Sequence, residues 1–414
     1  MVAIWNAATY PSIGGFDARE HIEYASGVVQ RGELPEGGAS YTPPGFYLLA
    51  GAGLEIGKAL GLDEPERVTQ MLNAALGVGT LLLLLALTRL LLPGRPLIQW
   101  VALAFFACCP VVLRTMAMFH PQPLAMFLST LALTLAARMI VRRRYGAWEW
   151  AGLALTLAAG QLVRSVGLWT VGVVVLTLIV TAAVQPEQRR RIGAGLGAAA
   201  AAAVLLALPW YVHLQLTTES AVFGRSFTTD LFPPGFPAAF YVSPGLPDVV
   251  TDPHRGDLEP RYFPILYTDT WGDYFGIWSW NPPRPELTPA VNRRLTLQSV
   301  AGLPLTIMAV AGWLALCGLA VARRRTMPGL LLVALMPLVA LAGTLYYATR
   351  GVVGDGDTVK AMFLLTAVPT WAVSFGFAAD VLVTRRRRTG LVVLAAAGAS
   401  CGVSLAYATF ALVS

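Results

Sequence analysis

Residues 70–92 read QMLNAALGVGTLLLLLALTRLLL, and Arg89 is the only charged residue in this stretch. An α-helix rises about 1.5 Å per residue, and the hydrocarbon core of a bilayer is about 30 Å thick. A helix of this length is therefore long enough to cross the core, and its side chains are apolar enough to remain there. The stretch predicts a transmembrane helix.

Similar apolar runs recur along the rest of the 414-residue chain. The composition agrees with them, because 56% of the residues are hydrophobic and only 13% are charged, against about 25% charged in a typical soluble domain. A soluble globular protein is thereby excluded. We predict an all-α integral membrane protein, a bundle of about ten transmembrane helices with an external juxtamembrane helix and external loops. The predicted spans are residues 70–92, 97–113, 121–141, 148–163, 166–184, 192–212, 298–322, 328–347, 361–383 and 390–412.

The formal net charge of +7 is unevenly distributed between the two faces. If ten spans alternate in direction, sixteen arginines lie at one face with only Glu149, Glu187 and Asp380 as acids, and the other face holds fourteen basic and twenty acidic residues. These arginines lie within 89–95, 138–144, 189–191, 323–325 and 385–388. Because Arg-rich loops stay in the cytoplasm, the acidic face is external. The positive charge thus indicates orientation in the lipid bilayer of the cell membrane, and no nucleic-acid partner.

This orientation divides the chain into four parts. They are an external N-terminal loop (1–69), a transmembrane bundle (70–212), an external loop (213–297) and the C-terminal transmembrane helices (298–414). The N-terminal loop begins on the external face without a preceding span. We therefore expect an N-terminal helix to be absent from this sequence.

The apolar stretch at about 44–62 is predicted to lie on the membrane surface. It carries Glu55, Lys58 and several glycines, which favours an interfacial helix over a spanning one. Counting it as a span would also invert every later loop and place the arginine-rich turns outside.

Residues 16–24, FDAREHIEY, contain the first cluster of groups that could carry chemistry. In a helix, residues at i, i+3, i+4 and i+7 share one face, here Asp17, Glu20, His21 and Tyr24. A carboxylate is deprotonated at neutral pH and can accept a proton from an attacking hydroxyl. The alternative is a solvated, amphipathic start to the membrane domain.

Two elements that follow this acidic motif carry a family resemblance. They are GELP at 32–35 and PPGFYLL at 43–49. Together with the acidic motif they resemble the first external loop of the GT-C glycosyltransferases, polytopic enzymes that include protein mannosyltransferases, aminoarabinose transferases and oligosaccharyltransferases. In that superfamily the two prolines open a juxtamembrane helix on the external side, and a transmembrane helix precedes the acidic loop. The resemblance implies Asp17 as the catalytic base, with Glu20, His21 and Glu23 in supporting or acceptor-binding roles.

A second external motif departs from the family pattern. Family members often carry another acid there, whereas this chain has FHPQPLA at 119–125, with His120 and Gln122 in that position. A metal site built on paired acids is therefore in doubt, and a divalent metal is compatible with the sequence but not required by it. The alternative reading of His120 is a structural hydrogen-bonding role.

Three cations are candidates for binding a donor phosphate. Arg164, in QLVRSVG at 161–167, resembles the family's break between two closely spaced helices. Lys360, one of only two lysines in the chain, and Arg350 flank the entry to a late helix that also resembles the family's. The alternative is that these side chains extend to the interface as anchors. Between them, Asp355 and Asp357 resemble part of a calcium loop but lack its other ligands.

Residues 262–280 hold eight aromatic residues in nineteen positions, with Asp269 and Asp273 among them. Aromatic residues at this density fit an interfacial belt. The alternative is contact with a sugar or a lipid, in which the two carboxylates would accept hydrogen bonds from hydroxyls of the acceptor.

The expected function is transfer of a sugar from a polyprenyl-phosphate donor to an envelope acceptor, a lipid, glycan or protein, on the external face. A polytopic transporter or a lipid-linked sugar flippase is the alternative, although transporters place charged sites near the bilayer midplane and show repeats. A scaffold subunit of an envelope-assembly complex is a third reading.

Overall fold

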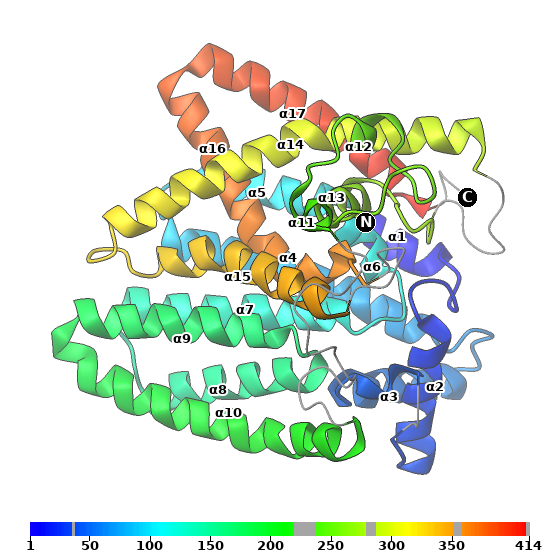
Figure 1. The fold of residues 1–414 in the computed structure, drawn as a ribbon. Coiled ribbons are helices and arrows are strands. Elements are labelled where there is room, and N and C mark those ends of the chain that lie inside the picture. The colour runs from blue at the N-terminus through cyan, green and yellow to red at the C-terminus, as the bar shows by residue number, and fades with distance from the viewer. Residues whose placement is uncertain (35–37, 219–236, 279–286, 352–357, 411–414) are drawn as a thin grey trace.

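The computed structural model describes residues 1–414 except 35–37, 219–236, 279–286, 352–357 and 411–414. The described residues form helices and connecting loops, without a β-strand (Figure 1). The helices are α1 (Val2–Thr9), α2 (Ala18–Arg31), η1 (Gly38–Tyr41), α3 (Gly45–Ala59), α4 (Arg67–Leu91), α5 (Pro96–Cys108), α6 (Pro110–Met116), α7 (Gln122–Arg142), α8 (Ala147–Val163), α9 (Gly167–Val184), η2 (Pro186–Gln188), α10 (Arg189–Thr218), α11 (Ala238–Val242), α12 (Asp248–Thr251), α13 (Tyr262–Trp271), α14 (Pro289–Ala322), α15 (Leu330–Gly351), η3 (Ala361–Ala367), α16 (Val368–Arg385) and α17 (Arg387–Tyr407).

Eight described helices are long and apolar enough to cross a membrane, and they include α4, α7, α9, α14 and α16. The predicted span 97–113 is divided between α5 and α6, which meet at an angle of 59° and make a ninth if they cross together. The predicted span 148–163 corresponds to α8, which has only 17 residues. The membrane-spanning, all-α prediction is confirmed; among the described residues, length and composition give eight or nine spans, and the exact number of ten is not confirmed.

The bend between α5 and α6 has a local cause. A residue that precedes proline avoids the helical region, and Cys109, before Pro110, is extended at φ −72° and ψ 115°. Proline is favourable in the first turn of a helix, so α6 starts at once in a new direction. The turn brings the buried Arg114 of α6 to the end of the bundle.

Helix α16 lies at the centre of the bundle. In its apolar window 78% of the residues are buried, against 17% for α10 and 22% for α17. Glycines allow neighbouring backbones to approach it closely. A Cβ atom at Gly312 of α14 would lie 1.9 Å from the carbonyl oxygen of Ser374, and one at Gly376 would lie 2.5 Å from that of Ile98 in α5.

The arginine-rich turns lie together at one end of the helices. Figure 1 shows the α9–α10 and α14–α15 turns at the left-hand end of the bundle, away from both termini. Arg95 pairs with Asp380 at 2.8 Å and Arg143 pairs with Glu187 at 3.1 Å. Two of the three acids predicted for this face thus neutralise neighbouring arginines.

The opposite end carries the short helices and the long connections. Figure 1 shows α2 running across the direction of α7, α9 and α10, with α1 and α6 above it and α11–α13 beyond them, next to α14. The stretch predicted to be interfacial is helical as α3, and its depth in the membrane remains a prediction. Helical structure enters the predicted 213–297 loop from both sides, because α10 continues to Thr218 and α14 begins at Pro289.

Candidate functional site

Asp17 stands exposed at the N-terminus of α2, where the chain turns sharply. Its backbone is left-handed, with φ 52° and ψ 25°, a region that residues other than glycine seldom adopt and that often marks functional sites. Gly15, two residues earlier, has φ 110°. The Asp17 side chain caps no amide of its own helix, and a carboxylate is favoured at the positive end of a helix. Asp17 is therefore a solvent-accessible carboxylate.

The polar residues that follow Asp17 divide between two sides of α2. His21 and Tyr24 are buried, whereas Glu20 and Glu23 are exposed. Tyr24 stacks on Tyr47 of α3 with ring centroids 3.7 Å apart. The predicted common face therefore separates into a buried aromatic side and an exposed acidic side.

His21 is held in a polar contact beneath the surface. Its Nδ1 atom lies 2.7 Å from the Tyr47 hydroxyl, and its ring meets the ring of His120 edge to face at 4.8 Å. Burial lowers the pKa of His21 to about 3, and the positive charges of Arg164 and Lys360 act in the same direction. His21 is thus neutral at physiological pH, with its Nε2 atom buried and without a hydrogen-bond partner among the described residues.

His120 lies against His21, and Gln122 contacts His120 through its backbone. The backbone amide of Gln122 donates to His120 Nδ1 at 3.1 Å. Asn73 of α4 donates to the carbonyl oxygens of Met118 and His120 at 2.8 and 3.0 Å. Burial, His21 and two nearby cations lower the pKa of His120 well below its usual value. In the described part of the chain no three His, Cys, Asp or Glu side chains are grouped so that they could hold a metal ion.

Arg164 lies at a cavity of about 140 Å³ between the start of α9 and the end of α15. Its Nη1 atom donates to the Thr42 hydroxyl at 3.2 Å, and its Cζ atom lies 5.6 Å from the centroid of the Phe363 ring. The rest of the lining is mainly apolar and aromatic, and includes Leu168, Trp169 and Tyr347. The cavity thus has one cationic end and an apolar body.

Arg350 lies near the same cavity. Its Cζ atom is 5.6 Å from the ring centroid of Tyr346, a residue that also lines the cavity. The other half of the predicted motif, Asp355 and Asp357, lies outside the described residues.

Lys360 lies next to the acidic start of α2. Its ammonium nitrogen is 4.6 Å from the ring centroid of Phe16 and 5.9 Å from that of Phe275. These two rings meet edge to face at 5.4 Å. The fold thus brings a cation from position 360 against Phe16, the residue that directly precedes the candidate base.

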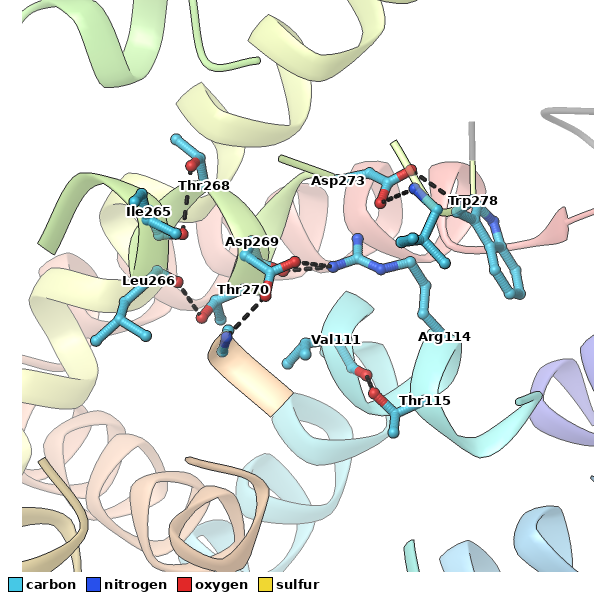
Figure 2. A network of polar contacts seen from close by, with 12 residues as sticks. Val111, Arg114, Thr115, Ile265, Leu266, Thr268, Asp269, Thr270, Asp273 and Trp278 are labelled. Carbon is cyan, nitrogen blue, oxygen red and sulfur yellow. Dashed lines mark hydrogen bonds and ion pairs between the residues drawn. The ribbon is translucent and has the colours of Figure 1, made fainter. Parts of the chain in front are cut away.

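The two carboxylates of the aromatic segment are buried in protein contacts. Asp269 accepts a hydrogen bond from the Ala361 amide at 2.7 Å and pairs with Arg114 at 3.5 Å (Figure 2). Asp273 accepts from the amides of Ile277 and Trp278 at 3.2 and 2.8 Å. Their predicted acceptor-binding role stays a prediction, and the contacts present are internal.

Several residues of this end were not identified from the sequence as site residues. They are Thr42, Tyr47, Asn73 and Arg114. Arg114 could have been identified from the sequence, since a charged residue inside an apolar run is costly and requires a partner. The others are ordinary polar residues whose role depends on segments more than 20 residues away.

The comparisons with known proteins bear on this arrangement. No family model and no curated protein sequence matches the chain. The structure of ArnT from Cupriavidus metallidurans bound to undecaprenyl phosphate is similar, with a TM-score of 0.55 and 13% identity over 96% of this chain and 62% of that one. The chain thus spans under two thirds of that protein's length.

The oligosaccharyltransferase of Archaeoglobus fulgidus is also similar. Its apo form gives a TM-score of 0.62 with 14% identity over 99% of this chain and 55% of that one. The archaeal AglB in complex with an inhibitory peptide and a dolichol-phosphate gives 0.61 with 16% identity, over 99% and 54%. At identities this low the TM-scores show a shared fold alone, and the chain therefore has the fold of ArnT and of the archaeal oligosaccharyltransferase.

Proposed function

We propose that this protein is a membrane glycosyltransferase that moves a sugar from a polyprenyl-phosphate donor to a hydroxyl-bearing envelope acceptor. One observation carries the proposal: an exposed carboxylate, Asp17, and two cations, Lys360 and Arg164, gather at the end of the bundle opposite the arginine-rich turns. The shared fold with ArnT and AglB, whose structures contain undecaprenyl phosphate and dolichol-phosphate, supports this assignment.

The cavity beside Arg164 suits the donor lipid. A phosphate favours a guanidinium, which can offer it paired N–H donors, and an isoprenoid chain favours an apolar wall. Arg164 provides the guanidinium, and Leu168, Trp169 and Tyr347 provide the apolar wall. Because the cavity lies between α9 and α15, a lipid could enter from the bilayer without leaving it.

Asp17 would act as the general base. It takes the proton from the acceptor hydroxyl, whose oxygen attacks the anomeric carbon while the bond from that carbon to the phosphate oxygen breaks. The departing polyprenyl phosphate gains negative charge, which Lys360 and Arg164 balance; preorganised cations are effective because they need no rearrangement during the reaction. Such a single displacement inverts the anomeric configuration, by analogy with hydrolases.

The reaction is assigned to the external face on the distribution of charge. The sixteen arginines of the opposite end are the type of cluster that is retained in the cytoplasm. Labelling of a cysteine introduced at Ser40 from the cytoplasmic side alone would contradict this orientation.

The test is transfer by purified protein from labelled polyprenyl-phosphate sugars to candidate acceptors. Asp17→Asn should abolish most transfer, whereas Asp63→Asn, an equal loss of charge at another exposed aspartate of the N-terminal segment, should not. Transfer at the wild-type rate by Asp17→Asn would remove Asp17 from the mechanism. Substrate flux in vesicles without transfer from any donor would instead favour the transporter.

A further inference from the structure

The Arg114–Asp269 pair joins three segments that are distant in the sequence. Arg114 belongs to α6 and Asp269 to α13, and one Asp269 oxygen accepts from the amide of Ala361, the residue after Lys360. Arg114 also donates to the backbone carbonyl of Asp269. Figure 2 shows Arg114 pointing at Asp269 from the adjacent helix. Both side chains are about 95% buried, so water does not weaken the contact.

The backbone directly after Lys360 is held by this pair. Lys360 precedes η3, and its own backbone is extended, at φ −117° and ψ 131°. The Asp269 carboxylate holds the first amide of η3, while Phe16 and Phe275 provide the surface on which the ammonium lies. A long flexible side chain such as lysine is directed by where its backbone is fixed and by what its stem packs against.

We propose that Arg114 and Asp269 are positioning residues, which fix the Lys360 ammonium over Phe16 so that it can meet the donor phosphate beside Asp17. The inference rests on the proposed function for the role of the phosphate, but the placement of Lys360 can be tested without any donor. It gives Asp269 a different role from contact with the acceptor.

A pH effect is available to test the pair without mutation. Burial raises the pKa of Asp269 to about 6, with Arg114, the Ala361 amide and Lys360 opposing the rise and Asp273 adding to it. His21 and His120, whose protonation is disfavoured by the Lys360 charge, have strongly lowered pKa values and stay neutral near pH 6. Protonation of Asp269 weakens its attraction to Arg114, so Lys360 should lose its fixed position as the pH falls through about 6.

The lysine content of the chain makes the placement measurable. Lys58 and Lys360 are its only lysines, so reductive ¹³C-methylation, which keeps their charge, yields two lysine NMR signals besides that of the N-terminus. The rings of Phe16 and Phe275 should displace the Lys360 signal. Lys58 is exposed and paired with Glu55, and serves as the internal reference.

The expected result is that Arg114→Met and Asp269→Asn each move the Lys360 signal towards that of Lys58. Arg95→Met, which breaks the ion pair with Asp380 at the other end of the bundle, should leave it unchanged. In the wild type the same movement of the Lys360 signal should occur on lowering the pH, with a midpoint near 6. This measurement needs no variant, so it still tests the pair if a variant fails to fold. An unchanged Lys360 signal in both variants, or across that pH range, overturns the positioning role.

Binding of undecaprenyl phosphate to the detergent-solubilised protein tests the link to the donor. Lys360→Met should weaken binding about tenfold, as expected for a lost charged contact, and Arg114→Met should weaken it similarly. The double variant should bind no more weakly than Lys360→Met alone; losses that simply multiply would overturn the inference. Wild-type binding by Lys360→Met would contradict the phosphate role in the proposed function, while the NMR signal would still decide the placement.

Discussion

Removing Arg114 should destabilise the protein by an amount that depends on pH. Two unit charges 3.5 Å apart attract by about 5 kcal/mol at an effective dielectric constant of about 20. Arg114→Met should lower the free energy of unfolding by less than that, because the Asp269 carboxylate, left without its partner, can take up a proton. With its native pKa at about 6, protonation at pH 7.5 costs about 2 kcal/mol.

Loss of the hydrogen bond that Arg114 donates to the Asp269 carbonyl oxygen adds about 1 to 1.5 kcal/mol. The expected cost at pH 7.5 is therefore about 3 to 3.5 kcal/mol. At pH 5 the wild-type carboxyl is already largely protonated, so only the hydrogen-bond contribution of about 1 to 1.5 kcal/mol remains.

The sign follows from proton linkage. The native pKa of Asp269 lies above the 3.8 of an exposed aspartate. As the pH rises, the unfolded chain therefore releases this proton first, and the Asp269 contribution to wild-type stability falls as the pH rises from about 4 to about 6. Without Arg114 the native pKa rises further, and the fall continues above pH 6. The two proteins should therefore diverge above pH 6 and converge below it, while titration of His21 and His120 affects both equally.

Thermal unfolding followed by tryptophan fluorescence in detergent micelles, from pH 5 to pH 8, measures this difference. Trp271 lies two residues beyond Asp269 and is buried, so it reports on the region. Arg95→Met is the matched control: Arg95 is 54% exposed, so its ion pair should be worth under about 1 kcal/mol. Equal costs for Arg114→Met at pH 5 and pH 7.5 would refute the electrostatic reasoning and indicate that Arg114 acts by packing alone.

Four further outcomes are expected. Asp17→Asn should lower the sugar-transfer rate about 10²- to 10⁴-fold, the usual contribution of a general base, with Asp63→Asn unaffected in the same assay. Arg164→Met should weaken undecaprenyl phosphate binding about tenfold or more, whereas Arg144→Met, at the arginine-rich end, should bind normally in a titration. Because His21 has a native pKa of about 3, the unfolded chain takes up its proton below about pH 6.5, so the His21 contribution to stability should decline with acidification; His21→Gln should remove that contribution in melting curves. Gly312→Ala should cost about 3 kcal/mol or more by overpacking against Ser374 and lower the melting temperature, while Gly398→Ala, with open space around it, should not.

The overall architecture could be predicted because each membrane span is specified by its own residues. A run such as 70–92 must be helical in lipid, since every backbone polar group has to find its partner within the segment. The exact number of spans is not confirmed by the same local criteria. Pro110 divides one predicted span into α5 and α6 with a 59° bend, and α8 matches its predicted run but has only 17 residues.

The amino-acid sequence by itself determined the apolar helices, the two oppositely charged ends and the candidate polar residues, because hydropathy, charge and spacing are local properties. Only the tertiary structure decided which of these residues meet. Lys360 lies over Phe16, His21 touches His120, and Asp269 pairs with Arg114, contacts between segments about 100 to 340 residues apart. Such contacts arise because a buried charge or polar group needs a partner, and where that partner lies in the chain depends on how the helices pack.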